Sequence, residues 1–153
     1  GKWSEDYREK INQAQKEEKR YHKIKKGLDD VKSLALRNRY TLDIYEQNNY
    51  LQNYPTQLIL ALSAVDSAKN ADDRKSALKK LKDTCDGFDL MRENLEEVYS
   101  KTRFMEQPDG YIEDMNHHSH LSAKTQNSDW IYLYELSMVS KIKYWLKTTS
   151  NEN

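Results

Sequence analysis

Hydrophobic residues recur every three or four positions over most of the chain, and strand-like alternation is scarce. The spacing predicts a first helix that begins at Ser4, with Gly27 as its end or as a bend. A second helix is expected from about Asp29 toward Asn53. Pro55 then either opens a new helix or kinks a continuing one. The first half of the chain is therefore predicted to be helical throughout.

The clearest helical pattern lies in the middle of the chain. After a polar break at residues 70–73, apolar side chains alternate by three and four residues, which is typical of the buried seam of a bundle helix. These residues are Leu78, Leu81, Cys85, Phe88, Leu95 and Tyr99. Arg92 stands where the same spacing would place an apolar residue. We expect Cys85, which lies on the seam, to be a buried and inert thiol.

A final helix is predicted to begin near Ser128, a residue type that favours the helix N-cap. Its spacing puts Trp130, Tyr134 and Trp145 on the stripe that faces the core, and leaves Tyr132 off that stripe. Taken together, the pattern predicts an all-α fold, an up-and-down bundle of four to five helices with one long irregular loop.

That loop is the segment of residues 104–127, which has no periodicity and contains the turn signal Pro108-Asp109-Gly110. A segment of this length without regular structure is uncommon in a compact domain unless it has a role. We therefore expect an ordered loop before the last helix. Residues 1–153 are expected to form a single domain, excised from a longer chain because it opens with Gly1 and no Met.

Composition changes this picture in three ways. The chain is polar, with 33% charged residues and a mean hydropathy of −1.06, but its 11 Tyr, three Trp and two Phe supply buried area. The 25 basic and 25 acidic residues balance, so no net charge attracts nucleic acid or an anionic membrane. No apolar run approaches the roughly 20 residues of a membrane span. We therefore expect neither nucleic acid nor a membrane span.

The loop holds three of the four histidines, His117, His118 and His120, close to Asp114. Helical metal sites place ligands at i and i+4, and zinc sites usually draw ligands from a second element. Neither pattern is present, and the nearby serines lack a glycine elbow. We therefore predict no metal, no cofactor and no catalytic residue. In the simpler interpretation, Asn116, His117, His118 and Ser119 hydrogen-bond the loop backbone.

The loop is nevertheless the predicted contact site. Rings beside Asn, His and Asp would form a shelf for a sugar or a peptide, although core rings are the more ordinary interpretation. The candidate residues for a domain contact or a ligand are Tyr111, Asp114, Asn116, His117, His118, His120 and Trp130.

The segment "MRENLEEVYSKTRFMEQPDGYIEDMNHHSHLSAKTQNSDWIYLYELSMVSKIKYWL", residues 91–146, resembles the C-terminal helical region of bacterial family 20 β-N-acetylhexosaminidases. In those glycoside hydrolases a similar run, of the type "NLE…YSKTR…P-x-GY…D…HH-x-H-L-x…DW…E", follows the catalytic barrel. The helix at residues 36–46 adds weak support. The chain has no Asp-Glu pair of the kind that family uses, and it is too short for a barrel of about 250 residues.

The resemblance implies a non-catalytic accessory domain that stabilises the catalytic barrel or forms one wall of its substrate cleft. Its partners would be the catalytic domain of the same parent chain and a glycan, and its location would be periplasmic or extracellular. The alternative is a free-standing helical module that binds another protein through an exposed apolar face. A third hypothesis, a metal-dependent enzyme that uses the loop histidines, is the weakest.

Overall fold

The structure is a computed structural model that describes residues 1–101 and 132–150. All regular secondary structure within these ranges is helical. The helices of this part are α1 (Lys2–Asp6), α2 (Arg8–Leu34), α3 (Arg39–Asp66), α4 (Ala71–Asp86), α5 (Phe88–Ser100) and α6 (Leu133–Ser150). The predicted all-α bundle is therefore confirmed.

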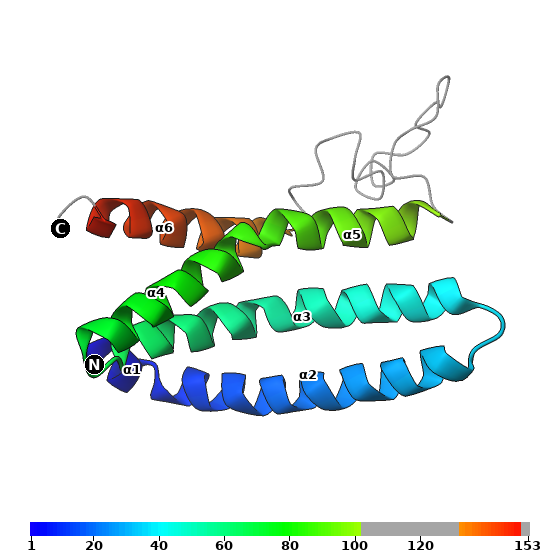
Figure 1. Ribbon diagram of the computed structural model, residues 1–153, viewed down its shortest axis with the longest axis horizontal. Coiled ribbons are helices and arrows are strands. Elements are labelled where there is room, and N and C mark those ends of the chain that lie inside the picture. Colours follow the sequence, from blue (N-terminus) through cyan, green and yellow to red (C-terminus); the bar gives the residue numbers. More distant parts are fainter. Residues whose placement is uncertain (102–131, 151–153) are drawn as a thin grey trace, which may run out of the picture.

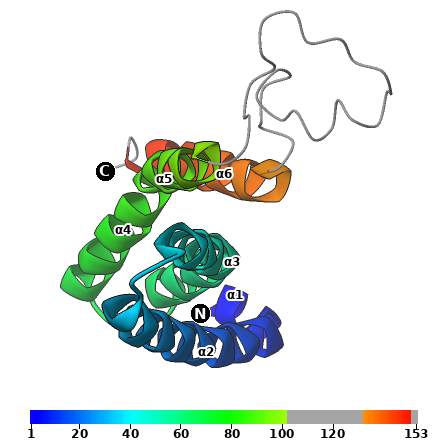
Figure 2. The same cartoon turned by 90° about the vertical axis from the view of Figure 1, so that its right-hand side faces the viewer.

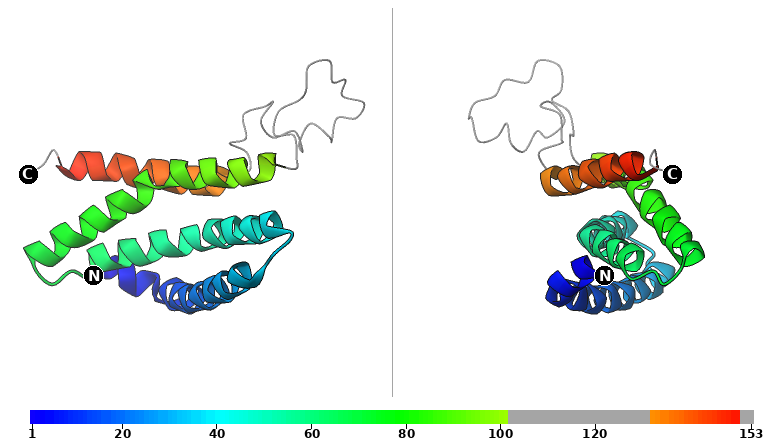
Figure 3. Two further views of the ribbon diagram at one scale, coloured as in Figure 1. Left: turned by 45° about the vertical axis from the view of Figure 1, so that its right-hand side comes forward. Right: turned by 90° about the vertical axis from the view of Figure 1, so that its left-hand side faces the viewer.

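The central helix is α3. It forms an antiparallel hairpin with α2, and it also contacts α1, α4 and α5 (Figure 1). From the end of α3 the chain turns into α4, which rises across the bundle and leads into α5. Figure 2 shows α2 on one side of the molecule and α6, which packs on α4, on the opposite side. The two further views in Figure 3 show the same order of layers.

The core lies where α3, α4, α5 and α6 meet. Its buried side chains are Tyr54, Leu58, Ala61, Val65, Leu81, Cys85, Phe88, Leu95, Tyr132, Val139 and Ile142. Four of them are the predicted seam residues Leu81, Cys85, Phe88 and Leu95, which confirms that the three-and-four spacing marks the buried face. Leu78 and Tyr99, at the ends of that seam, are half-buried against the cluster.

The predicted boundary between the first two helices is wrong. Residue Gly27 lies inside α2, which continues to Leu34, and the chain turns only at residues 35–38. A single glycine in a helix costs about 1 kcal/mol relative to alanine, which packing against a neighbouring helix readily offsets. The turn instead uses Asn38, whose φ of 55° is the left-handed conformation that Asn tolerates better than most residues.

The two arms of the hairpin are held together by Lys32. Its ammonium group lies 2.8 Å from a carboxylate oxygen of Asp43 and 2.7 Å from one of Glu46. The hydrogen bond to Asp43 makes the largest contribution to the raised pKa of Lys32, and the hydrogen bond to Glu46 makes the next largest. The last turns of α2 are thereby fixed against the first turns of α3.

Pro55 neither opens nor ends a helix, because α3 runs without interruption from Arg39 to Asp66. A proline inside a helix removes one backbone hydrogen bond. The helix nevertheless continues, since Tyr54 and Thr56 beside the proline, and Leu58 one turn later, are buried against the rest of the bundle. By contrast, the predicted seam helix is divided at Gly87, between α4 and α5.

Candidate functional site

The predicted contact site cannot be placed on the fold. Its residues, Tyr111, Asp114, Asn116, His117, His118, His120 and Trp130, all lie outside the described residues. The predicted loop of residues 104–127 and the predicted helix start at Ser128 lie outside them as well. These remain predictions, and the surfaces described below come from residues 1–101 and 132–150.

Helix α6 shows a clear reversal of the sequence prediction. Tyr132, which the spacing placed off the core stripe, is only 1% exposed, while Tyr134 is 81% exposed and Trp145 is also exposed. The side of α6 that faces the bundle carries Leu136, Val139, Ile142 and Leu146, and Tyr132 immediately before the helix continues this side. These residues recur at three- and four-residue intervals, so they form a helical stripe of their own.

The opposite side of α6 also carries large apolar side chains. Leu133, Tyr134, Tyr144 and Trp145 are exposed, and at 100° per residue these four fall on one side of the helix. The exposed polar residues Ser137, Lys141 and Thr148 lie among them. We call these four residues the outer face of α6. Because a surface helix normally carries polar residues away from the core, these large exposed side chains make the outer face a candidate contact surface.

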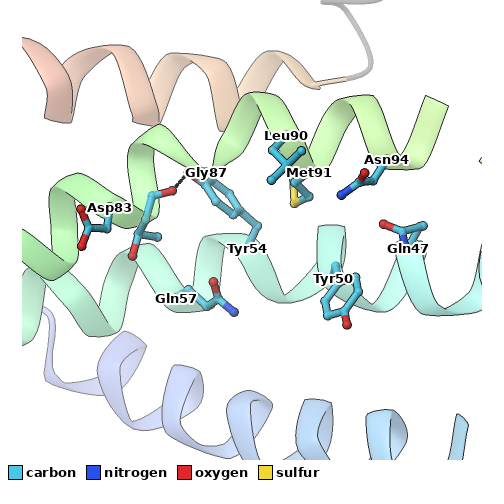
Figure 4. Close-up of a pocket in the computed structure, with 10 residues that line it drawn as sticks. Gln47, Tyr50, Tyr54, Gln57, Asp83, Gly87, Leu90, Met91 and Asn94 are labelled. Atoms are coloured by element: carbon cyan, nitrogen blue, oxygen red, sulfur yellow. Dashed lines mark hydrogen bonds between the residues drawn. The ribbon is translucent and has the colours of Figure 1, made fainter. Parts of the chain in front are cut away.

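A shallow groove of about 300 Å³ runs between α3 and the α4–α5 junction (Figure 4). The lining residues are Gln47, Tyr50, Tyr54, Gln57, Asp83, Thr84, Gly87, Leu90, Met91 and Asn94. The Tyr54 hydroxyl donates a 2.8 Å hydrogen bond to the Thr84 carbonyl oxygen. Side-chain amides of Gln47 and Asn94 face each other across the groove in Figure 4. The groove is open to solvent, and these contacts of its lining residues indicate no reaction there.

A second cleft, of about 230 Å³, lies between α2 and α3. It is lined by Glu17, Arg20, Tyr21, Ile24, Asn49, Gln52 and Asn53. Asn53 is 5% exposed, and neither its amide nitrogen nor its amide oxygen has a hydrogen-bond partner. A buried polar group left without a partner costs about 1–3 kcal/mol. Asn49 and Asn53 are four residues apart, so they lie on the same side of a helix. This spacing is the sequence signal that could have indicated polar side chains in the cleft.

Burial raises the pKa values of the titratable groups in the core. Burial raises the pKa of Tyr132 to about 12, and it raises the pKa of Tyr54 further above the ordinary value. Burial also raises the pKa of the Cys85 thiol, which is fully buried. These hydroxyl and thiol groups therefore stay protonated near neutral pH and serve packing. Within the described ranges, no group of three or more potential ligands is placed to hold a metal ion.

Among the described helices, none combines the length and the apolar content that a bilayer span requires. Comparisons with protein-family models, with curated proteins and with solved structures found no match for this chain.

Proposed function

We propose that the chain is a non-catalytic helical accessory domain of a bacterial carbohydrate-active enzyme, and that it packs on the catalytic domain of the same parent chain. The observation that carries the proposal is the outer face of α6. It belongs to the segment of residues 91–146, whose sequence resembles the C-terminal helical region of family 20 β-N-acetylhexosaminidases. The proposal joins that resemblance to an exposed apolar surface in the same segment.

The chemistry of the outer face suits a permanent contact. Two tyrosines and a tryptophan supply large, rigid apolar area, and such residues are enriched at the centres of protein interfaces. Lys141, on the same side of the helix, would lie within or at the edge of such a contact. Burial of these rings against a catalytic domain would remove from water the apolar area that the bundle leaves uncovered.

A glycan contact is the second part of the proposal. Aromatic rings with a few fixed polar groups form the kind of shallow surface that binds sugars. The exposed rings of Tyr134 and Tyr144 would then form part of one wall of the substrate cleft. In this role the domain would touch the substrate of its parent enzyme without taking part in bond cleavage.

The experiment is a binding measurement between two separately produced parts. The reading frame that encodes this chain would be examined for a catalytic domain, and that domain would be titrated with the chain by isothermal titration calorimetry. We expect a one-to-one complex. The double variant Tyr134→Ser/Trp145→Ser should weaken it by at least about tenfold, because interface rings of this kind each contribute more than 1 kcal/mol.

The matched control is Lys147→Ser, a change at an exposed polar position of the same helix. It should leave the affinity unchanged. A reading frame without a catalytic domain, or an affinity that is the same for the double variant and the unaltered chain, would overturn the proposal.

One observation favours the alternative function, a free-standing module that binds another protein. The end of α2 and the turn after it carry a second set of exposed apolar side chains, Val31, Leu34 and Leu36, of which Leu36 is 96% exposed. This turn lies at the end of the molecule far from both termini (Figure 1). Two separate apolar surfaces would suit a module that bridges partners. If the reading frame encodes no catalytic domain, this alternative is the one to pursue.

A further inference from the structure

The cleft between α2 and α3 is small, and buried side-chain amides are among the groups that line it. Its sides are formed by Tyr21 and Ile24 on α2 and by Gln52 on α3. Its floor includes two buried amides, Asn49 and Asn53. A cleft of about 230 Å³ is somewhat smaller than the sites that hold drug-sized ligands, so it suits a small molecule or one unit of a larger one.

Asn53 is the group that points to a ligand. Its side chain offers two donors and an acceptor, and both the nitrogen and the oxygen lack a partner. Asn49, one helical turn away, already has a partner, because its amide nitrogen donates a hydrogen bond to the Tyr21 carbonyl oxygen at 3.5 Å. Both amide atoms are covered, so contact with a ligand requires the Asn53 side chain to turn about its terminal torsion, which is broad for an asparagine.

The charges at the rim indicate that the ligand is neutral. Arg20 lies 3.8 Å from one carboxylate oxygen of Glu17, and Gln13 donates to the other at 2.7 Å. Arg20 and Glu17 are the charged residues among those that line the cleft, and their opposite charges offset each other. Recognition in this cleft therefore rests on hydrogen bonds and on contact with the apolar side chains.

We propose that the α2–α3 cleft binds a small neutral ligand that presents a hydrogen-bond donor and an acceptor side by side. Neighbouring hydroxyl groups of a sugar and a carboxamide share this chemistry. Either would pair with the carboxamide of Asn53 and lie against Tyr21 and Ile24. The inference goes beyond the proposed function and does not depend on the outer face of α6, which lies on the other side of the bundle (Figure 2).

Water is the competing occupant. A polar cleft holds water where two or more polar groups converge, and bound water would also satisfy the Asn53 amide. The two accounts differ in one measurable respect, since a site filled by water alone does not saturate with an added solute.

The experiment follows backbone and side-chain amide signals by heteronuclear NMR while the chain is titrated with glucose, acetamide and N-acetylglucosamine in turn. We expect saturable shifts of the Asn49 and Asn53 signals with at least one probe. Saturation by glucose but not by acetamide assigns the site to sugars, and saturation by acetamide assigns it to carboxamides. With Asn53→Leu, an apolar residue of similar size, the dissociation constant should rise at least about tenfold.

The matched control is Gln57→Leu, which changes an amide on the same helix that lines the other groove. Its dissociation constant should equal that of the unaltered chain. A second variant, Asn53→Asp, retains the shape of the side chain and removes the donor, and it should also weaken binding. Absence of saturation with all three probes, or equal affinity in Asn53→Leu, would leave water as the sole occupant and overturn the proposal.

Discussion

The guanidinium carbon of Arg92 lies 4.8 Å from the centre of the Tyr132 ring. The same cation lies 5.9 Å from the ring of Phe88, and the planes of the Phe88 and Tyr132 rings are at 88° to each other. The residue that interrupts the apolar seam of α5 thus lies against the buried rings that join α5 to the start of α6. A positive charge over an aromatic face is favourable, and the arginine stem adds apolar contact.

This geometry predicts that Arg92→Ala destabilises the bundle by about 1–2 kcal/mol, through loss of the cation and of its stem. The free energy of unfolding would be measured by urea titration, with tryptophan fluorescence as the signal. Arg92→Lys retains a cation but not the planar group, so its loss should be smaller. Equal stability of Arg92→Ala and the unaltered chain would show that the contact contributes nothing.

The start of α4 is stabilised by one side chain. The Asn70 amide oxygen accepts a 2.8 Å hydrogen bond from the backbone N–H of Asp73, which is the usual geometry of a helix N-cap. Asn70→Ala should therefore lower the free energy of unfolding by about 1 kcal/mol. Asn70→Ser, which replaces one good cap by another, is the matched control in the same urea titration. A loss of equal size in both variants would contradict the assignment.

Cys85 is predicted to be unreactive in the folded chain. Its side chain is fully buried and burial raises its pKa, so the nucleophilic thiolate is scarce. An aromatic disulfide reagent added to the native protein should release its coloured thiol slowly, and addition of denaturing urea should release it at once. Rapid reaction in the absence of urea would show that the α4 seam opens readily.

Acid should weaken the contact between α1 and α3. Asp66, at the end of α3, accepts a 2.8 Å hydrogen bond from the backbone N–H of Ser4, and this bond is the main reason that its pKa is lowered. A carboxyl whose pKa is lower in the folded state stabilises that state above the unfolded pKa of about 3.9. The contribution is lost as the pH falls through the folded-state pKa.

Asp66→Asn therefore tests the acid dependence directly. The difference in stability between this variant and the unaltered chain should be present at neutral pH and should shrink as the pH falls below about 4. Urea titrations at a series of pH values would measure it. Glu93→Gln, a change at an exposed position of α5, serves as the control. A difference that is independent of pH would rule out the carboxylate of Asp66 as its source.

The amino-acid sequence by itself determined the helical class and the buried seam of α4 and α5. Leu81, Cys85, Phe88 and Leu95 are buried as their spacing predicts, and α4 begins within the polar break, where the structure shows Asn70 as its N-cap. These features are local: a helix repeats every 3.6 residues, and a cap bonds a backbone group three positions away. Neighbouring residues in the chain therefore carry the information.

Only the tertiary structure decided which of two apolar sides of α6 is buried. Tyr132 is buried and Tyr134 is exposed, although the spacing suits either side, because periodicity tells which residues share a face and not which face meets α4. Tertiary packing likewise explains why α3 continues through Pro55 and α2 continues through Gly27. The cleft that contains Asn53 exists only because residues of α2, far away in the sequence, close over that position of α3.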